Sequence, residues 1–287
     1  MAEIVLVAVM IVQVLAKAFV QMIASNFLID EINKKFGAVT RARECYLYTK
    51  KGQRLLDLWQ LGGRAILGWG NSKPQTVFKN VLNRGISGFF HTEFDESVQK
   101  SVSSLLESPR ICLFYNSKTE AFKAALTFSS EDTNFYRPWN PVKFEWKEKD
   151  CVILEPFFAW AQNIFIVAVK PELFEIALAC QKQFSQGIFI PSPLSAAVSR
   201  AFYDLKKELP NRSEKDWFIY DKILVKYWTR KGPYLFPKVP KEKYFDFALK
   251  LLDCNIVISP DFFTPSVVPF HADIGNFTKL KNLNFEF

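Results

Sequence analysis

The strongest indication of the fold comes from residues 110–129, RICLFYNSKTEAFKAALTFS. Its first six residues form a short apolar run, which is typical of a buried strand. The polar residues after this run lead into a helix that we expect from Ala121 to about Ser129. A strand that runs directly into a helix presents free backbone amides and the positive end of the helix dipole to an anion.

Two further apolar runs extend this pattern, CVIL at residues 151–154 and IFIVAV at residues 164–169. Strands that are apolar throughout and alternate with helices are typical of parallel sheets. We therefore expect an α/β fold with a mostly parallel central sheet flanked by helices.

The periodicity elsewhere in the chain predicts both helices and strands. We expect a hairpin with strands at 44–49 and 54–58 around a turn at 50–53. Residues 210–234 are charged and rich in turn signals, so we expect a linker or a sheet edge there. Further helices are expected at residues 26–36, 73–82, 93–106, 194–208, 241–252 and 278–283, and strands at 255–259 and 266–270.

The composition of the 287 residues excludes several classes of protein. Hydrophobic residues make up 49% and aromatic residues 16%, which rules out a disordered, collagen-like or low-complexity chain. The net charge is +8, but basic residues never run longer than two, so we expect no nucleic-acid partner. Five cysteines without a CxxC pair and two histidines predict neither disulfides nor a metal site. Free thiols fit a reducing compartment, and we expect the cytoplasm.

The first 24 residues are distinguished by their apolar character. Residues 4–16, IVLVAVMIVQVLA, carry no charge, whereas a membrane span requires about 20 largely apolar residues. Three interpretations stay open: an upstream extension with Met22 as the true start, a membrane segment, or an export signal with a site at Ala16–Ala18. Membrane association or export is therefore expected only if the leader, residues 1–24, is genuine.

Four stretches of the chain resemble motifs of the class III aminotransferases, which are pyridoxal-phosphate-dependent transferases of fold type I. They are CYLYTKKGQRLLDLWQLGGRAILGWG at residues 45–70, CLFYNSKTEAFKAAL at 112–126, VILEP at 152–156 and NIVISPDFFTPSVVPF at 255–270. The resemblance implies an aminotransferase-like fold with a shortened large domain from residues 74–201. It also implies a smaller α+β domain formed by both chain ends, residues 25–73 and 202–287.

The chain departs from this family at the residues that carry its chemistry. The strand end Asp-Glu-Val, whose Asp pairs with the pyridinium nitrogen, is missing, and so is the glycine-flanked lysine that forms the Schiff base. The lysine near the expected place is Lys170, and a solvated turn residue is its alternative interpretation. Residues 135–138, FYRP, stand where the family has the aromatic-His pair that stacks on the cofactor ring. We therefore expect a catalytically degenerate protein without a cofactor. An active enzyme that binds pyridoxal phosphate, or a non-enzymatic assembly or regulatory partner, is the alternative.

The candidate anion site is the turn formed by Ser117, Lys118 and Thr119. The two hydroxyls and the free amides of the helix start suit a small anion such as phosphate. Lys118 stands where the family has glycine, so its side chain either pairs with the anion or fills the site. The alternative is a plain helix cap, with Ser117 or Asn116 as the capping residue and Glu120 in the first turn.

Three further polar residues lie in motifs that the resemblance covers or adjoins. Arg64, within a glycine-rich segment, is the candidate to hold a substrate carboxylate, and a surface arginine is the alternative. Asp57 ends the hairpin and is expected to bond to turn amides. His91 lies in a segment that resembles the family's interface stretch, next to Phe89 and Phe90. The resemblance implies a homodimer, because the family builds its site across a two-fold interface.

Overall fold

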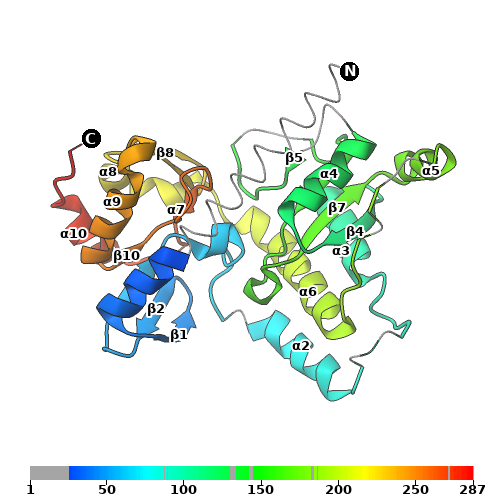
Figure 1. The fold of residues 1–287 in the computed structure, drawn as a ribbon, viewed down its shortest axis with the longest axis horizontal. Helices are drawn as coiled ribbons and strands as arrows, with labels where there is room; N and C mark the ends of the chain where they lie inside the picture. The colour runs from blue at the N-terminus through cyan, green and yellow to red at the C-terminus, as the bar shows by residue number, and fades with distance from the viewer. Residues whose placement is uncertain are drawn as a thin grey trace. The chain divides into compact units, whose positions relative to one another are not determined.

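The computed structural model divides the chain into two compact units. Unit 1 contains residues 1–70 and 212–287, and unit 2 contains residues 71–211. The expected domain boundaries lie at 73/74 and 201/202; the second of these would cut α6 (Ser192–Glu208), which belongs entirely to unit 2 (Figure 1). The structure describes residues 26–70, 72–86, 88, 90–129, 134–141, 145–181, 184–185, 187–270 and 272–286.

The apolar leader, residues 1–24, lies outside the described residues, so the three interpretations of it stay predictions. Among the described helices, none has the length and apolar character that a membrane crossing requires.

Unit 1 contains a four-stranded sheet in the order β1-β2-β3-β10. Its strands are β1 (Val39–Arg43), β2 (Tyr46–Thr49), β3 (Arg54–Asp57) and β10 (Ile256–Val257). The expected hairpin is confirmed, because β2 and β3 pair antiparallel around a tight turn. β10 pairs with β3 in parallel, with Ile256 opposite Leu56, so residues from both ends of the chain share one sheet.

Two helices pack on this sheet. Residues 26–36 are helical, as expected, and the helix ends at Gly37, whose φ of 75° lies in the left-handed region that glycine adopts readily. The second helix is α9 (Lys241–Asp253). Their apolar faces meet the strands in a core formed by Leu28, Ile32, Phe36, Leu55, Leu252 and Val257.

The segment 210–234 is folded, so the expectation of a linker is wrong. It continues from η3 (Leu209–Asn211) through α7 (Glu214–Phe218) and α8 (Asp221–Leu224) to β8 (Trp228–Lys231). Its charged residues pair with one another, since the Arg230 guanidinium bonds to the carboxylates of Asp221 and Glu214.

The expectation of a sheet edge holds for β8, which is the outer strand of a second sheet. That sheet has the order β11-β9-β8, with β9 (Tyr234–Pro237) and β11 (Ser266–Val267). After β11 the chain continues to η4 (Ile274–Phe277) and α10 (Thr278–Lys281).

Unit 2 contains the predicted α/β sheet, in the order β4-β7-β6-β5. Three of its strands, β4 (Ile111–Tyr115), β6 (Cys151–Leu154) and β5 (Asn134–Phe135), run in one direction. The fourth, β7 (Phe165–Val169), lies between β4 and β6 and is antiparallel to both, where a parallel strand was expected. Ten residues, including η2 (Ala159–Ala161), join β6 to β7, and a parallel crossover requires a dozen or more.

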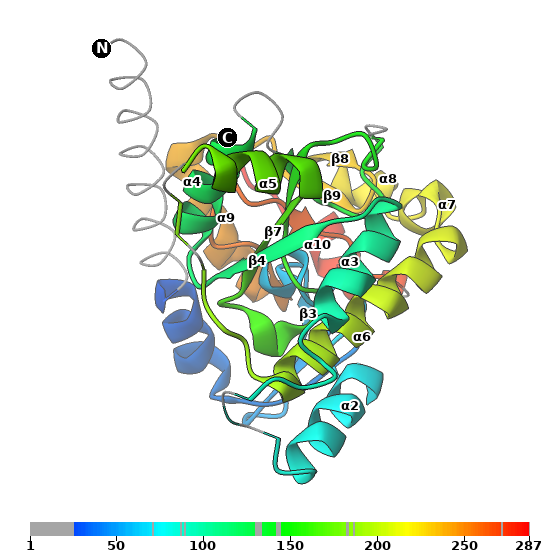
Figure 2. The ribbon, with the colours of Figure 1, turned by 90° about the vertical axis from the view of Figure 1, so that its right-hand side faces the viewer.

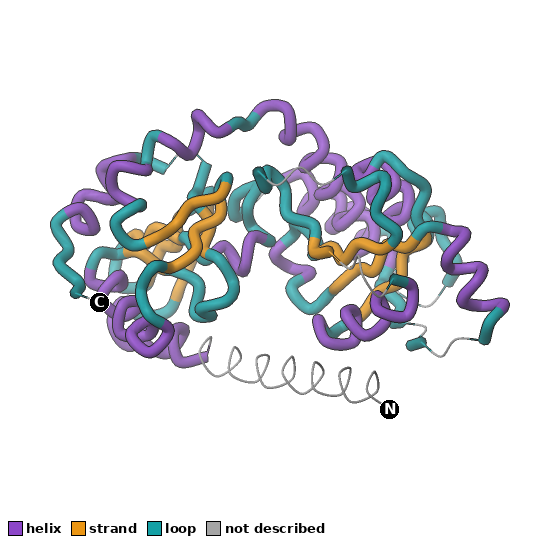
Figure 3. The backbone as a smooth tube through the Cα atoms, turned by 90° about the horizontal axis from the view of Figure 1, so that it is seen from above, coloured by secondary structure: helices purple, strands orange, loops and turns teal. Residues whose placement is uncertain are grey.

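Helices cover both faces of this sheet. Figure 2 shows α4 (Lys118–Phe128) and α5 (Pro171–Ala179) on one side of β4 and β7, and α3 (Ser97–Leu106) and α6 on the other. α2 (Ser72–Asn83) packs on α6. In Figure 3 the four strands of unit 2 form one group with these helices around them. The core under α4 and α5 contains Tyr115, Ala121, Ala124, Ala125, Phe128, Cys151, Ile153, Val167, Val169 and Ala177.

Candidate functional site

The carboxyl ends of β4 and β6 lie at the same end of the sheet in unit 2. Tyr115, the last residue of β4, is opposite Phe165, and Leu154, the last residue of β6, is opposite Ile166. The residues that follow these strands therefore meet at one edge, which is where ligands bind in open α/β sheets. We call this the carboxyl edge of the sheet.

The anion turn lies at the carboxyl edge and forms the start of α4. The structure places Ser117 as the N-cap: its Oγ accepts from the Glu120 amide at 3.5 Å, and its carbonyl accepts from the Ala121 amide at 3.0 Å. Thr119 is buried. The helix begins at Lys118, three residues earlier than expected, because the cap satisfies the first amides.

The Lys118 side chain crosses the carboxyl edge. Its Nζ lies 3.9 Å from Oε1 of Glu155, the residue after β6. The same ammonium lies 4.7 Å from the ring centroid of Phe135, the last residue of β5. Lys118 therefore brings together the ends of three strands, by a cation–π contact and a long ion pair.

Lys170 lies at the opposite end of the sheet, which we call the amino edge. It follows β7, whose last residue Val169 is opposite Ile111 at the start of β4. Its Nζ lies 3.0 Å from Oδ1 of Asp150 and donates to the Glu148 carbonyl at 2.9 Å. At about 3.3 Å per residue, the length of β4 separates Lys170 from the anion turn by on the order of 15 Å.

Arg110 is the main polar residue of the amino edge, and the sequence analysis missed it as a site. Its side chain is 1% exposed. One guanidinium nitrogen donates to the Trp146 carbonyl at 2.8 Å and to the Lys147 carbonyl at 3.3 Å, and the other donates to the Lys149 and Asp150 carbonyls. Burial lowers the pKa of this guanidinium. Arg110 thus ties the loop before β6 to the start of β4.

Arg64 and Asp57 both lie in unit 1. Arg64 is buried directly after η1 (Gln60–Gly63), so the interpretation as a surface arginine is wrong. Asp57 accepts from the amides of Trp59 at 2.9 Å and Gln60 at 3.0 Å, which confirms the expected bonds to turn amides. Its other oxygen accepts from the Trp69 indole at 2.7 Å. Burial raises the pKa of the Asp57 carboxyl.

The histidines and cysteines contribute no metal site among the residues that the structure describes. His91 is exposed, and its Nδ1 lies 3.0 Å from the Asp95 carboxylate, which lowers the pKa of Asp95. His271 lies outside the described residues. All five cysteines are free, and burial raises the pKa of the Cys112 and Cys151 thiols to about 12.

No protein-family model matches the chain. Two curated proteins, both described as uncharacterized, resemble it in sequence. One, from Treponema pallidum, is 26% identical over 83% of this chain and 91% of that protein. The other, from Borreliella burgdorferi, is 23% identical over 84% of this chain and 89% of that protein. Both alignments cover most of the two chains that they compare.

Solved structures that match the chain include aminotransferases and an aminomutase. An ornithine aminotransferase from Plasmodium yoelii has a TM-score of 0.61 at 11% identity, covering 90% of this chain and 97% of that chain. An acetylornithine aminotransferase from Elizabethkingia anophelis has a TM-score of 0.59 at 14% identity, with the same coverage. A glutamate-1-semialdehyde aminomutase from Pseudomonas aeruginosa has a TM-score of 0.59 at 10% identity and covers 85% of each chain. At these low identities the likeness shows the fold alone: the chain folds as the fold-type-I aminotransferases do, as its motifs predict.

Proposed function

We propose that this chain is an aminotransferase-fold protein in which Lys118 closes the cofactor site, so that it does not catalyse transamination. The observation that carries the proposal is the position of the Lys118 ammonium, 4.7 Å from the Phe135 ring and 3.9 Å from Glu155. The resemblance places a glycine at the position of Lys118 and the aromatic residue that stacks on the cofactor near Phe135.

The described residues do not fit pyridoxal phosphate in the arrangement that the resemblance implies. Transamination requires an amine that can lose its proton beside the phosphate turn. The Lys170 amine lies at the amino edge instead, in an ion pair with Asp150. A lysine side chain cannot extend from there to the carboxyl edge, and Lys118 occupies the space over Phe135.

Titration with pyridoxal phosphate tests this proposal. We expect no stoichiometric Schiff-base absorbance band from the native chain, and no band that borohydride bleaches. A band that disappears in Lys170→Ala would overturn the proposal and identify an active enzyme. The matched control is Lys123→Ala, which removes a lysine from the middle of α4.

A second role is favoured by the cap geometry at Ser117: the turn binds a small anion, and Lys118 turns toward it as a ligand. The helix dipole alone contributes about 0.3–1 kcal/mol per exposed charge, so binding would be in the millimolar range. Calorimetry with phosphate on Lys118→Gly separates the two roles of the side chain. Higher affinity identifies Lys118 as a plug, and lower affinity identifies it as a ligand. If neither chain binds phosphate, the turn is only a helix cap and the anion role is wrong.

We also propose that the chain is a homodimer, as the resemblance implies. Phe90 in the interface-like segment is 73% exposed, whereas Phe89 lies outside the described residues. Burial of such a side chain at a subunit contact is favourable. We expect a dimer by light scattering at micromolar concentration and a shift toward monomer in Phe90→Glu. Phe218→Glu, at another exposed phenylalanine, is the control; a monomeric native chain would contradict the proposal.

A further inference from the structure

The segment formed by α7 and α8 in unit 1 carries apolar side chains on two opposite sides (Figure 1). Its backbone is helical almost throughout, because Ile219 and Tyr220, which lie between the two helices, also have right-handed helical φ and ψ angles. The inner side carries Trp217, Tyr220 and Leu224, which are buried. Their spacing of three and four residues is that of one side of a helix, so this side anchors the segment in the core.

The opposite side of the segment is exposed. We call it the outer face of α7–α8; it is formed by Lys215, Phe218, Ile219, Lys222, Val225 and Lys226. Phe218 is 65% exposed, Ile219 53% and Val225 43%. A helix with apolar residues on both sides is expected to be covered on both sides, and clustered exposed apolar side chains mark interaction sites. We therefore expect a partner to cover the outer face.

The carboxylates of the segment are bound within unit 1 itself. Asp221 and Glu214 both pair with the Arg230 guanidinium of β8, at 2.8 Å for Oδ2 of Asp221. The Asp216 carboxylate accepts from the Ser213 amide at 2.7 Å, as part of a capping box. These contacts hold the acidic side chains beside β8 and at the start of α7, so their charges are already balanced by groups of the fold.

The ammonium groups of the outer face are not neutralised by any carboxylate that the structure describes. Lys215 and Lys222 form neither an ion pair nor a hydrogen bond with a described residue. Lys226 donates to the Leu283 carbonyl at 2.7 Å and so keeps its full charge. Between residues 214 and 238, six cations stand against three carboxylates. The outer face thus combines exposed apolar side chains with uncompensated positive charge.

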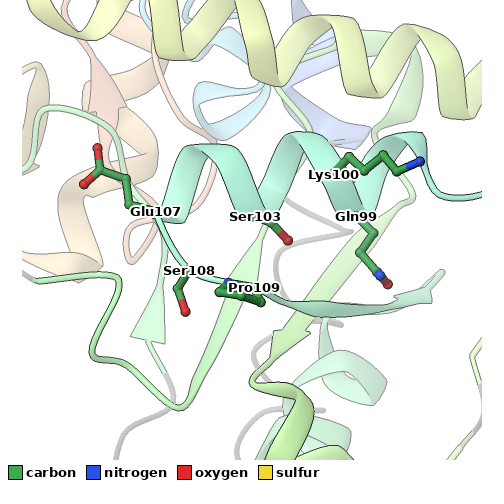
Figure 4. Close-up of a pocket in the computed structure, with 6 residues that line it drawn as sticks. All are labelled: Gln99, Lys100, Ser103, Glu107, Ser108 and Pro109. Carbon is green, nitrogen blue, oxygen red and sulfur yellow. The ribbon is translucent and has the colours of Figure 1, made fainter.

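A hollow beside α3 in unit 2 shows a different use of surface side chains. Figure 4 shows Gln99 and Ser103 on the side of α3 that faces β4. They accept from the backbone amides of Cys112 and Arg110, at 3.4 and 3.0 Å, and so complete the edge of β4. The side chains that line this hollow therefore serve the fold, whereas the exposed apolar side chains of the outer face of α7–α8 have no such role.

From this arrangement we infer that the outer face of α7–α8 binds the surface of an anionic lipid membrane. Phe218, Ile219 and Val225 enter the boundary between headgroups and acyl chains, as the apolar side of an interfacial helix does. The lysines of the face lie at the level of the headgroups, where anionic lipids attract each of them and their long side chains keep the ammonium groups in water.

A second copy of the chain fits this face less well than a membrane does. A two-fold contact would bring the same lysines of both copies together, and like charges repel one another at an interface. Anionic headgroups supply the negative charge that the face lacks, and the acyl chains accept its apolar side chains. The inference is independent of the proposed function and of the leader, because it uses only described residues of α7, α8 and their surroundings in unit 1.

A fluorescent label at residue 219 reports whether this face enters a membrane. The full chain with Ile219→Cys and Cys180→Ser is labelled with an environment-sensitive dye at neutral pH. Three of the other thiols are buried, and burial raises the pKa of the Cys112 thiol to about 12, so they do not compete for the dye. We expect brighter, blue-shifted emission with vesicles of phosphatidylcholine and phosphatidylglycerol, and no change with phosphatidylcholine alone.

The native chain labelled at Cys180 is the control, because this exposed thiol lies in unit 2 and outside the outer face. If residues 1–24 alone attached the chain to vesicles, the label at residue 219 would stay in water. Emission at residue 219 that does not change with the anionic vesicles would overturn the inference, and so would an equal change with both kinds of vesicle.

Substitutions then separate the charge of the face from its apolar contact. In the labelled chain, we expect Lys222→Gln to raise the lipid concentration for half of the response about threefold to fivefold. Lys50→Gln, at an exposed lysine of the turn between β2 and β3, is its control. Val225→Ser should raise it about threefold, whereas Val39→Ser, at a valine of β1 that is 45% exposed, should not. Lys222→Gln and Val225→Ser chains that respond as their controls do would contradict the inference.

Discussion

The two edges of the sheet in unit 2 are held together in different ways. At the amino edge, a buried Arg110 donates to four backbone carbonyls, and Lys170 forms a 3.0 Å ion pair with Asp150. At the carboxyl edge, Lys118 is 44% exposed, and its ion pair with Glu155 is 3.9 Å long. The amino edge is therefore a structural clamp, whereas interactions at the carboxyl edge can be lost without loss of the fold.

The difference bears on where this fold tolerates change. Carbonyls left unpaired in a buried place cost far more than a broken ion pair in water. We therefore expect substitutions at the carboxyl edge, such as those of Lys118, to have little effect on folding. The comparison between the edges predicts a clear order of effects on stability.

The largest effect is expected for Arg110→Met, which breaks the clamp. Methionine removes the Arg110 donors from four carbonyls. Those of Trp146 and Asp150 keep the backbone amides of Lys149 and Lys170, whereas those of Lys147 and Lys149 lose the guanidinium in a buried place. The free energy of unfolding should therefore fall by about 2–4 kcal/mol. Urea unfolding followed by tryptophan fluorescence measures the change. Arg110→Lys keeps the charge but not the planar set of donors. We expect its free energy of unfolding to lie between those of the native chain and Arg110→Met. A loss below about 1 kcal/mol in Arg110→Met would show that the loop before β6 is not held by these bonds.

The next effect is a loss of stability at alkaline pH through the Cys151 thiol at the amino edge. Burial raises its pKa to about 12, so between pH 9 and 12 the folded state keeps a proton that the unfolded state releases. The free energy of unfolding therefore falls with rising pH, by about 1 kcal/mol per pH unit above pH 9.

Urea midpoints at pH 8 and pH 10, under reducing conditions, measure this dependence. We expect Cys151→Ala to have a shallower pH dependence than the native chain, whatever the cost of the substitution at pH 8. Cys180→Ala is the control, because that thiol is exposed. Identical slopes in all three chains would mean that Cys151 does not titrate as its burial implies.

A smaller effect is expected for Lys170→Ala. The substitution removes the ion pair with Asp150 and the hydrogen bond to the Glu148 carbonyl, and we expect a loss of about 1 kcal/mol. The same urea experiment measures it. If Lys170→Ala were neutral while Lys118→Ala destabilised the chain, the contrast between the two edges would be reversed.

The smallest effect is expected for Lys118→Ala. An exposed ion pair and a cation–π contact each contribute about 0.5 kcal/mol, and alanine returns part of this through its higher helix propensity. The unfolding free energy should change by less than about 0.5 kcal/mol. A loss above about 1.5 kcal/mol would mean that Lys118 is part of the core of the carboxyl edge.

The elements that sequence periodicity predicts are those whose stability is local. The helix at 26–36, the hairpin before Asp57 and the strand-to-helix turn at Ser117 all form where the pattern indicates. Their capping, turn and amphipathic signals lie within a few residues of one another. The sequence also predicts that unit 2 is an α/β unit, because its strands are apolar throughout.

One missed feature could have been read from the sequence. The reversed direction of β7 follows from a connection too short for a crossover, which the spacing of the two apolar runs already shows. The other missed features depend on residues far apart in the chain. The burial of Arg64 and the four carbonyls bound by Arg110 depend on tertiary packing, which no local pattern records. The segment 210–234 resembled a linker because it is rich in charged residues. The structure shows that Arg230 pairs with Asp221 and Glu214, which the local pattern does not record.

The parallel pairing of β3 with β10 has a consequence for how the protein is made. Leu56 meets a partner, Ile256, that leaves the ribosome 200 residues later. At a synthesis rate of about 5–20 residues per second, β3 has no partner on its outer edge for roughly 10–40 s. All of unit 2 is synthesised during this time. An open strand edge is a template for pairing with other chains. The nascent protein therefore passes through a period in which one edge of its first sheet is open to pairing with other chains.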